Sequence, residues 1–442
     1  MKDTYQQPVL AFWAALALAV NPLYFSLAFT FMTDVPFTAW SMLAFWFYFQ
    51  FLKQERLHWL GLAALFSGIA VLNRQSGLFM PLAFCVCYGY HILTKLPISF
   101  LIFFRKIGFA IFPLVFTIGS LIIFNYWIDA AAIRPSFLRD ISHIRWEMLL
   151  THTHIRAGLP ILYLGFFLLP FSIIHLRAHW WNLTLPKRLV VLGLTVLFAW
   201  VFFKDNLTGF PVGNIIYNAG IGPLTTFDAL LLNTNNYNNV ISNHWIWAIR
   251  IIMLLGGTLL FFTFFSNLLS VEKWNKLSYI KQVQLFAMLS VAAYLPLLIV
   301  SETYFDRYFI SIFPLIILGM LPARPPKLKL WKTLVMLIFV ATQFVFSLIG
   351  TRDYFQWNRL RWQAAKELET AGIERQKIDG GYEYNGWYFG DVDVEQKEWF
   401  WIWSNEYLIT FGQVPNYEVF KTYTYQRYLP YKKEVIYVLK KT

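Results

Sequence analysis

Long apolar runs recur along most of this 442-residue chain, and they limit its fold more than any other feature. A helix needs about 20 mostly apolar residues to cross the hydrocarbon layer of a membrane. Only 14% of the residues are charged, whereas soluble domains contain about 25%. The pattern predicts an all-α polytopic membrane domain over residues 1–350. Residues 351–442 are polar, aromatic and charged, which predicts a separate soluble domain.

The apolar runs predict about eleven transmembrane helices. They cover residues 9–31, 36–52, 57–72, 77–93, 107–127, 158–177, 188–203, 245–266, 282–300, 308–322 and 331–350.

The distribution of charge predicts how these helices are oriented. One alternating set of loops holds 15 basic residues and only two acids, Glu55 and Glu272. Short cytoplasmic loops collect Lys and Arg, so this side is expected to be the cytoplasm. The N-terminus is then cytoplasmic, and the C-terminal domain lies outside. The net charge of +13 follows from membrane topology, and we expect no nucleic-acid partner.

The C-terminal segment combines a helical pattern with strand patterns. Leu360, Ala364 and Leu368 form an apolar stripe that predicts a helix over residues 352–371, and Gly372 is a suitable residue to end it. The "KIDGG" stretch predicts a short strand and turn. The alternating stretches "EYLITFG", "YEVFKTYTYQRY" and "EVIYVLKK" predict further strands, and therefore a small α/β domain.

Most acids of the membrane domain fall in the loops expected outside. Asp34 lies in "TDVPF", between two apolar runs. Pro36 suits the first turn of a helix, so Thr33 or Asp34 could be its N-cap. The alternative is that Asp34 is a carboxylate directed into an outward-facing active site.

Two arginines are expected at outer helix ends. Arg74 lies in "VLNRQSG", and Arg307 and Tyr308 lie in "SETYFDRYF". They could be interfacial anchors, or they could bind a phosphate, because a guanidinium group matches phosphate geometry. In the second case, Glu302 or Asp306 would shape the acceptor side of the site.

Other polar groups give weaker signals. The stretch 142–156 could form an amphipathic helix on the membrane, and His143, His152 and His154 in it could bind a metal or be solvated. Cys85 and Cys87 lie inside an apolar run and are interpreted as packing residues. The Gly- and Asn-rich loop 204–244 is either a lid for sugars or lipids or a plain linker.

The order of three motifs resembles a known class of enzymes. They are "TDVP" after an apolar run, then "GIAVLNRQSG", then "DRYFISIFP" near the last runs. Together they resemble the GT-C class of integral-membrane glycosyltransferases. The resemblance is to the bacterial branch similar to protein O-mannosyltransferases and lipid A aminoarabinose transferase (family 39-type). Residues 352–390 are similar to the tail of one bacterial subgroup.

The resemblance implies an inverting glycosyltransferase of a bacterial inner membrane. Its donor would be a sugar on a polyprenyl-phosphate carrier, and its acceptor a lipid, glycan or protein on the outer face. Asp34 matches the position of a general base. Arg74, Arg307 and Tyr308 match positions that bind the lipid phosphate or donor. The resemblance implies no particular cofactor and is compatible with a divalent metal.

The chain differs from that family at its start. Family members begin with two further spans and an outer loop that carries the leading catalytic acid, and neither has a counterpart before residue 9. A truncated, non-catalytic relative that binds lipid-linked sugar is therefore an alternative. A transporter or flippase for lipid-linked saccharides is a third. Transport is less favoured, because the apolar runs carry few charges near their centres.

Overall fold

The structure is a computed structural model. It describes residues 8–94, 99–127, 146–173, 184–204, 215–217, 220–221, 243–269, 279–300, 305–320, 329–389, 404–429 and 431–442. The chain divides into two compact units. Unit 1 comprises Met1–Phe210 and Ala248–Ala341, and unit 2 comprises Pro211–Trp247 and Thr342–Thr442.

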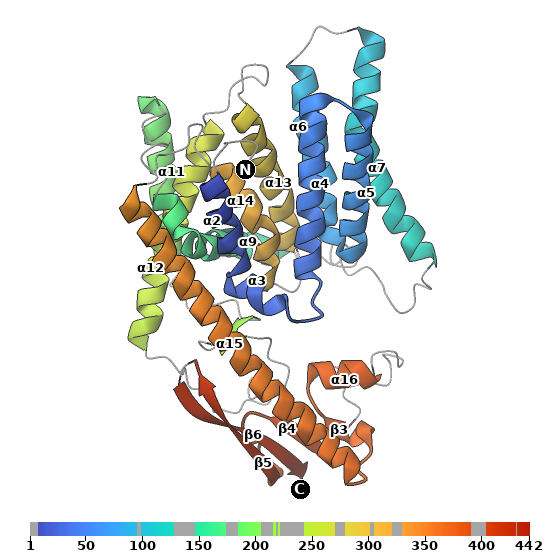
Figure 1. The fold of residues 1–442 in the computed structure, drawn as a ribbon, viewed down its shortest axis with the longest axis vertical. Coiled ribbons are helices and arrows are strands. Elements are labelled where there is room, and N and C mark those ends of the chain that lie inside the picture. The colour runs from blue at the N-terminus through green and yellow to red at the C-terminus, as the bar shows by residue number, and fades with distance from the viewer. Residues whose placement is uncertain are drawn as a thin grey trace. The chain divides into compact units, whose positions relative to one another are not determined.

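Unit 1 is helical throughout its described residues (Figure 1). Its elements are α2 (Pro8–Ala19), α3 (Pro22–Leu27), α4 (Asp34–Gln54), α5 (Leu57–Asn73), η1 (Gln75–Leu78), α6 (Phe79–Leu93), α7 (Phe100–Trp127), α9 (Trp146–Phe167), α11 (Leu185–Lys204), most of α12 (Asn243–Leu269), α13 (Tyr279–Val300), η3 (Asp306–Ile312), α14 (Phe313–Met320) and the start of α15 (Leu330–Thr370).

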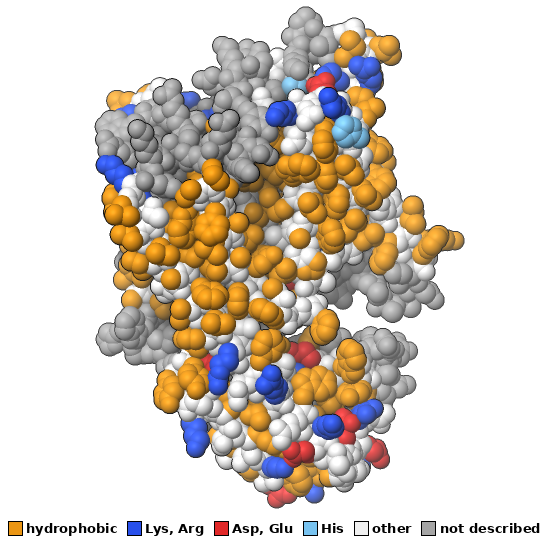
Figure 2. Space-filling model, viewed as in Figure 1, with side chains coloured by type: hydrophobic (Ala, Val, Ile, Leu, Met, Phe, Trp, Pro, Cys, Tyr) orange, Lys and Arg blue, Asp and Glu red, His pale blue; other side chains and the backbone are white. Residues whose placement is uncertain are grey.

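Six helical segments in the described part of the chain are long and apolar enough to cross a membrane. They are Asp34–Gln54, Gln75–Leu93, Phe100–Trp127, Trp247–Ser266, Ile280–Val300 and Leu330–Thr370. Many large apolar side chains are exposed on these helices, and Figure 2 shows them covering much of the visible surface of unit 1. An exposed apolar surface of this kind suits lipid rather than water. These features support an integral membrane protein.

The first predicted span, residues 9–31, is not a single helix. It is divided into α2 and α3 at Asn21 and Pro22. The Asn21 side chain accepts a hydrogen bond from the Leu23 backbone N–H (3.0 Å), and Pro22 occupies the first turn of α3. An N-cap residue followed by proline starts a new helix, because proline has no N–H to continue the previous one.

Aromatic rings hold α4 against its neighbours. Phe45 of α4 stacks on Phe286 of α13 with ring centroids 4.6 Å apart, and Tyr48 stacks on Phe84 of α6 at 4.4 Å. Each aromatic pair contributes about 0.5–1.5 kcal/mol beyond the area it buries. This packing fixes the axis of α4. It therefore also fixes the position of Asp34, the first residue of the helix.

Unit 2 contains the end of α15 and two small sheets. Its other elements are β1 (Ile216–Tyr217), β2 (Gly220–Ile221), η4 (Arg375–Lys377), β3 (Ile378–Asp379), α16 (Tyr382–Phe389), β4 (Tyr407–Thr410), β5 (Tyr417–Tyr428) and β6 (Tyr431–Lys441). The larger sheet has the order β3-β4-β6-β5, with β3 parallel to β4 and the other pairs antiparallel. This confirms the predicted small C-terminal sheet.

The predicted span at 331–350 and the predicted helix at 352–371 are both helical, and no break separates them. Both belong to the continuous helix α15. Gly350 lies within it, and a Cβ atom there would lie 2.6 Å from Cγ1 of Ile221, so glycine allows β2 to approach. A single glycine weakens a helix by only about 1 kcal/mol, which packing offsets. The helix ends as predicted before Gly372, whose φ is +87°.

Candidate active site around Asp34

Asp34 is fully buried at the N-terminal end of α4. A carboxylate is favourable there, because the first turn of a helix presents unpaired N–H groups. Thr33 occupies the N-cap position, as predicted, but its side chain makes no capping hydrogen bond. Its hydroxyl instead accepts a hydrogen bond from Nε of Arg74 at 2.9 Å.

Arg74 reaches Asp34 from the end of α5. It is the residue at which α5 ends, and its backbone is extended (φ −149°, ψ 127°) before η1 begins. The Nη1 atom of Arg74 lies 2.6 Å from Oδ1 of Asp34, and its side chain is 18% exposed. The break between α5 and η1 thus places a cation against a buried acid that lies 40 positions earlier.

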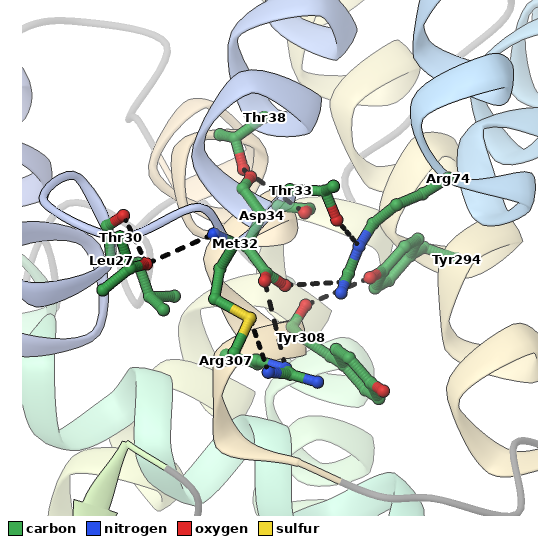
Figure 3. Close-up of polar contacts among 11 residues, drawn as sticks. Leu27, Thr30, Met32, Thr33, Asp34, Thr38, Arg74, Tyr294, Arg307 and Tyr308 are labelled. Atoms are coloured by element: carbon green, nitrogen blue, oxygen red, sulfur yellow. Dashed lines mark hydrogen bonds and ion pairs between the residues drawn. The ribbon is translucent and has the colours of Figure 1, made fainter. Parts of the chain in front are cut away.

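Arg307 and Tyr308 come to the same place from η3. Nε of Arg307 lies 3.9 Å from Oδ2 of Asp34 (Figure 3), and Nη1 donates a hydrogen bond to Sδ of Met32 at 3.2 Å. The Tyr308 ring centroid lies 5.0 Å from Cζ of Arg74 and 5.5 Å from Cζ of Arg307. One ring therefore contacts both guanidinium groups.

We name Asp34, Arg74, Arg307 and Tyr308 the Asp34 cluster. The close ion pair with Arg74 lacks the geometry of a hydrogen bond, and neither Asp34 oxygen accepts one from the residues that the structure describes. The carboxylate is therefore held mainly by charge. Its lone pairs remain able to accept a proton, and both guanidinium groups are of the type that binds phosphate.

The backbone around the cluster is held by further contacts that the sequence did not indicate. Tyr294 of α13 donates a hydrogen bond from its hydroxyl to the Tyr308 carbonyl at 3.1 Å. Thr38 of α4 lies 3.3 Å from Ser311 of η3, hydroxyl to hydroxyl. These residues lie within apolar runs, where their role depends on which helix packs beside them. The one sequence feature that could have indicated these contacts is that each of the three is a polar residue inside a predicted span.

Of the other predicted site residues, Asp306 is the one whose side chain the structure describes. Asp306 is buried at the start of η3, next to Arg307 in the chain. Glu302 and His143 lie outside the described residues. His152 and His154 fall in α9, but their side chains are outside those that the structure describes. Among the described residues, no group of three or more His, Cys, Asp or Glu could hold a metal.

A second ion-pair group lies at the opposite end of α4. Lys106 of α7 places Nζ 2.9 and 3.0 Å from the two carboxylate oxygens of Glu55, and Nε2 of His91 lies 3.3 Å from Oε1. Glu55 ends α4 in the left-handed backbone region (φ +50°). This group links α4, α6 and α7, and it offers a comparison for the Asp34 cluster.

Comparison with known proteins links the N-terminal part of the chain to one family. Residues 2–122 match the sequence model described as dolichyl-phosphate-mannose-protein mannosyltransferase. No curated protein and no solved structure gave a significant match. The matched segment contains Asp34 and Arg74, but not Arg307 or Tyr308. About a quarter of this chain is thus similar to a family of membrane glycosyltransferases, and that similarity covers half of the Asp34 cluster.

Proposed function

We propose that this protein is a GT-C-type membrane glycosyltransferase that moves a sugar from a polyprenyl-phosphate carrier to a lipid, glycan or protein acceptor. The observation that carries the proposal is the Asp34 cluster. Its members come from three distant parts of the sequence and meet around one buried carboxylate. The family match over residues 2–122 supports the same reaction class.

The arrangement suggests how the donor would be recognised. A lipid phosphate carries negative charge that the Arg74 and Arg307 side chains could share, and charge-assisted bonds of this kind are among the strongest in proteins. The Tyr308 ring, beside both guanidinium groups, would limit their movement. When the sugar is transferred, charge develops on the leaving phosphate, and the same two cations would stabilise it.

Asp34 would then act as the general base. In the free protein its carboxylate is paired with the two arginines. A bound phosphate would compete for those cations and release the carboxylate. A buried carboxylate without a partner is costly by several kcal/mol, so it would readily take the proton of an acceptor hydroxyl. The acceptor oxygen would attack the anomeric carbon, and the bond to the carrier phosphate would break with inversion.

The test uses the full chain in nanodiscs with radiolabelled polyprenyl-phosphate hexoses and pentoses. We expect Asp34→Asn to lower turnover by about 100-fold or more and to retain donor binding. Arg74→Gln and Arg307→Gln should instead weaken donor binding. Glu55→Gln is the matched control, because it removes a paired carboxylate from the other end of the same helix. It should leave turnover unchanged.

Three outcomes would contradict the proposed function. Wild-type turnover in a folded Asp34→Asn protein would show that Asp34 is not the base. Equal loss of thermal stability in Asp34→Asn and Arg74→Gln, with normal turnover of the remaining folded protein, would identify a purely structural ion pair. Donor binding without any transfer by the wild type would favour the non-catalytic alternative.

A further inference from the structure

The tip of the β5–β6 hairpin exposes two aromatic side chains. Tyr428 ends β5 and pairs with Tyr431, which begins β6. Their ring centroids are 5.8 Å apart, and the residues are 48% and 76% exposed. Exposed tyrosines at the end of a hairpin bury little within the protein. Packing within the protein therefore does not explain why two aromatic residues occupy this tip.

The tip is attached to α15 by several hydrogen bonds. Oδ2 of Asp353 accepts the backbone N–H groups of Tyr428 (2.8 Å) and Leu429 (2.9 Å). Arg352 donates from Nη1 to the Gln426 carbonyl (3.1 Å), and its Cζ lies 4.0 Å from the Tyr428 ring centroid. Asp353 is buried, so these bonds are shielded from water. The hairpin tip is thus fixed to residues 352–353 of the helix.

Residues 352–353 lie at the end of the apolar part of α15. Residues 333–351 contain no charged side chain and are bracketed by Lys332 and Arg352. At about 1.5 Å per residue this uncharged stretch is roughly 28 Å long, close to the hydrocarbon thickness of about 30 Å. Apart from Thr342, its exposed side chains are apolar as far as Leu348. If this stretch spans the membrane, Arg352 lies where the hydrocarbon meets the lipid headgroups.

The chemistry of the tip suits that level of the membrane. Tyrosine is enriched at membrane–water interfaces, where its ring is apolar and its hydroxyl is wet. Three basic residues, Arg427, Lys432 and Lys433, flank the two tyrosines in the sequence, and a fourth, Arg352, contacts the Tyr428 ring. The nearby acids are Asp353 and Glu434. A positive excess beside exposed tyrosines matches an anionic lipid surface.

We propose that the tip of the β5–β6 hairpin inserts into the headgroup layer of the membrane and binds anionic lipid. Tyr428 and Tyr431 enter the interface, and Lys432 and Lys433 bind headgroup phosphates. The hairpin is thereby a second attachment of the C-terminal unit to the membrane, beside α15 itself. This inference does not depend on the proposed glycosyltransferase activity, because the tip shares no residue with the Asp34 cluster.

The test measures the depth of a spin label on the full chain in nanodiscs. The background carries Cys85→Ala and Cys87→Ala, and the label is attached to a cysteine at position 431. A label at position 420 is the matched control. Phe420 is also an exposed aromatic of this hairpin (52%), but it lies eight residues from Tyr428, or roughly 26 Å along the strand.

We expect the label at 431 to collide more often with oxygen and less often with a water-soluble nickel chelate than the label at 420. In nanodiscs containing phosphatidylglycerol it should lie deeper than in phosphatidylcholine alone. Lys432→Gln with Lys433→Gln should remove that difference. Equal nickel accessibility at the two positions would overturn the proposal. The proposal would also be overturned if the label at position 431 were protected from the nickel chelate equally well in nanodiscs and in bilayer-free amphipol. Protein rather than lipid would then cover the tip.

Discussion

At the residue scale, two buried charges, Asp34 and Arg361, each have more than one polar partner. In unit 1, Asp34 is paired with two arginines. In unit 2, Arg361 forms an ion pair with Glu383 and donates a hydrogen bond to Oδ1 of Asn358 at 2.7 Å. Removing one partner of a buried charge typically costs about 3–5 kcal/mol. The fold therefore depends on these pairs, even though each pair adds little net stability.

Asp379 differs, because one of its oxygens is poorly satisfied. Its Oδ1 accepts hydrogen bonds from Asn385 (2.8 Å) and from the Gly381 N–H (3.1 Å), while Oδ2 has no partner among the described residues. Burial raises the pKa of Asp379 above its usual 3.8, although these two hydrogen bonds act in the opposite direction. Folding therefore favours the protonated form of this group.

This shift predicts a pH dependence of stability. The contribution of Asp379 is fully present below pH 3.8 and is lost as pH rises through the raised pKa of the folded state. Asp379→Asn keeps an acceptor for Asn385 and Gly381 but cannot titrate. We expect its thermal unfolding midpoint to fall less than that of the wild type as pH rises from about 4 to 7. Glu374→Gln, which removes an exposed carboxyl group, is the control. If the thermal unfolding midpoints of the Asp379→Asn and Glu374→Gln proteins changed equally with pH, the prediction would be contradicted.

At the scale of elements, glycine decides how closely two apolar helices of unit 1 cross. Gly165 of α9 faces Gly256 and Gly257 of α12, and a Cβ atom on Gly165 would collide with the backbone of Gly257. Small residues let transmembrane helices approach until their backbones touch, which increases their van der Waals contact. The sequence shows the glycines, but periodicity does not indicate which helix they face.

Gly165→Ala should therefore destabilise the protein by about 1–3 kcal/mol, because a backbone neighbour cannot move aside as a side chain can. Gly193→Ala in α11 is the matched control. A Cβ there has no described atom within 4 Å, so helix propensity alone should make the change neutral or stabilising by up to about 1 kcal/mol. The readout is thermal unfolding in detergent. Equal effects of the two substitutions would disprove the close crossing.

At the scale of the whole molecule, the charge bias of the loops predicts the side on which each end lies. The 15 basic residues against two acids place one set of loops in the cytoplasm and the C-terminal segment outside. An alkaline phosphatase fusion after Thr442 should be active, and a green fluorescent protein fusion there should be dark. Fusions after Lys95 should give the reverse. A fluorescent fusion at Thr442 would invert the predicted topology.

Features that depend on local pattern can be predicted from the amino-acid sequence alone. Apolar runs indicated a membrane protein, alternation indicated strands β4, β5 and β6, and Gly372 marked the end of α15. The sequence also singled out Asp34, Arg74, Arg307 and Tyr308 as separate candidates. Local patterns carry this information because helix and strand periodicity depend on neighbours within a few residues.

Which of these residues meet depends on how the helices pack in three dimensions. Arg307 is 273 positions from Asp34, and no periodic pattern records a contact over that distance. The close approach of Ile221 to Gly350 within α15 is likewise a contact between segments far apart in the sequence. The physical reason is the same in both cases. Ion pairs and close contacts between distant segments depend on how helices pack, and that packing minimises the free energy of the whole fold rather than of any one segment.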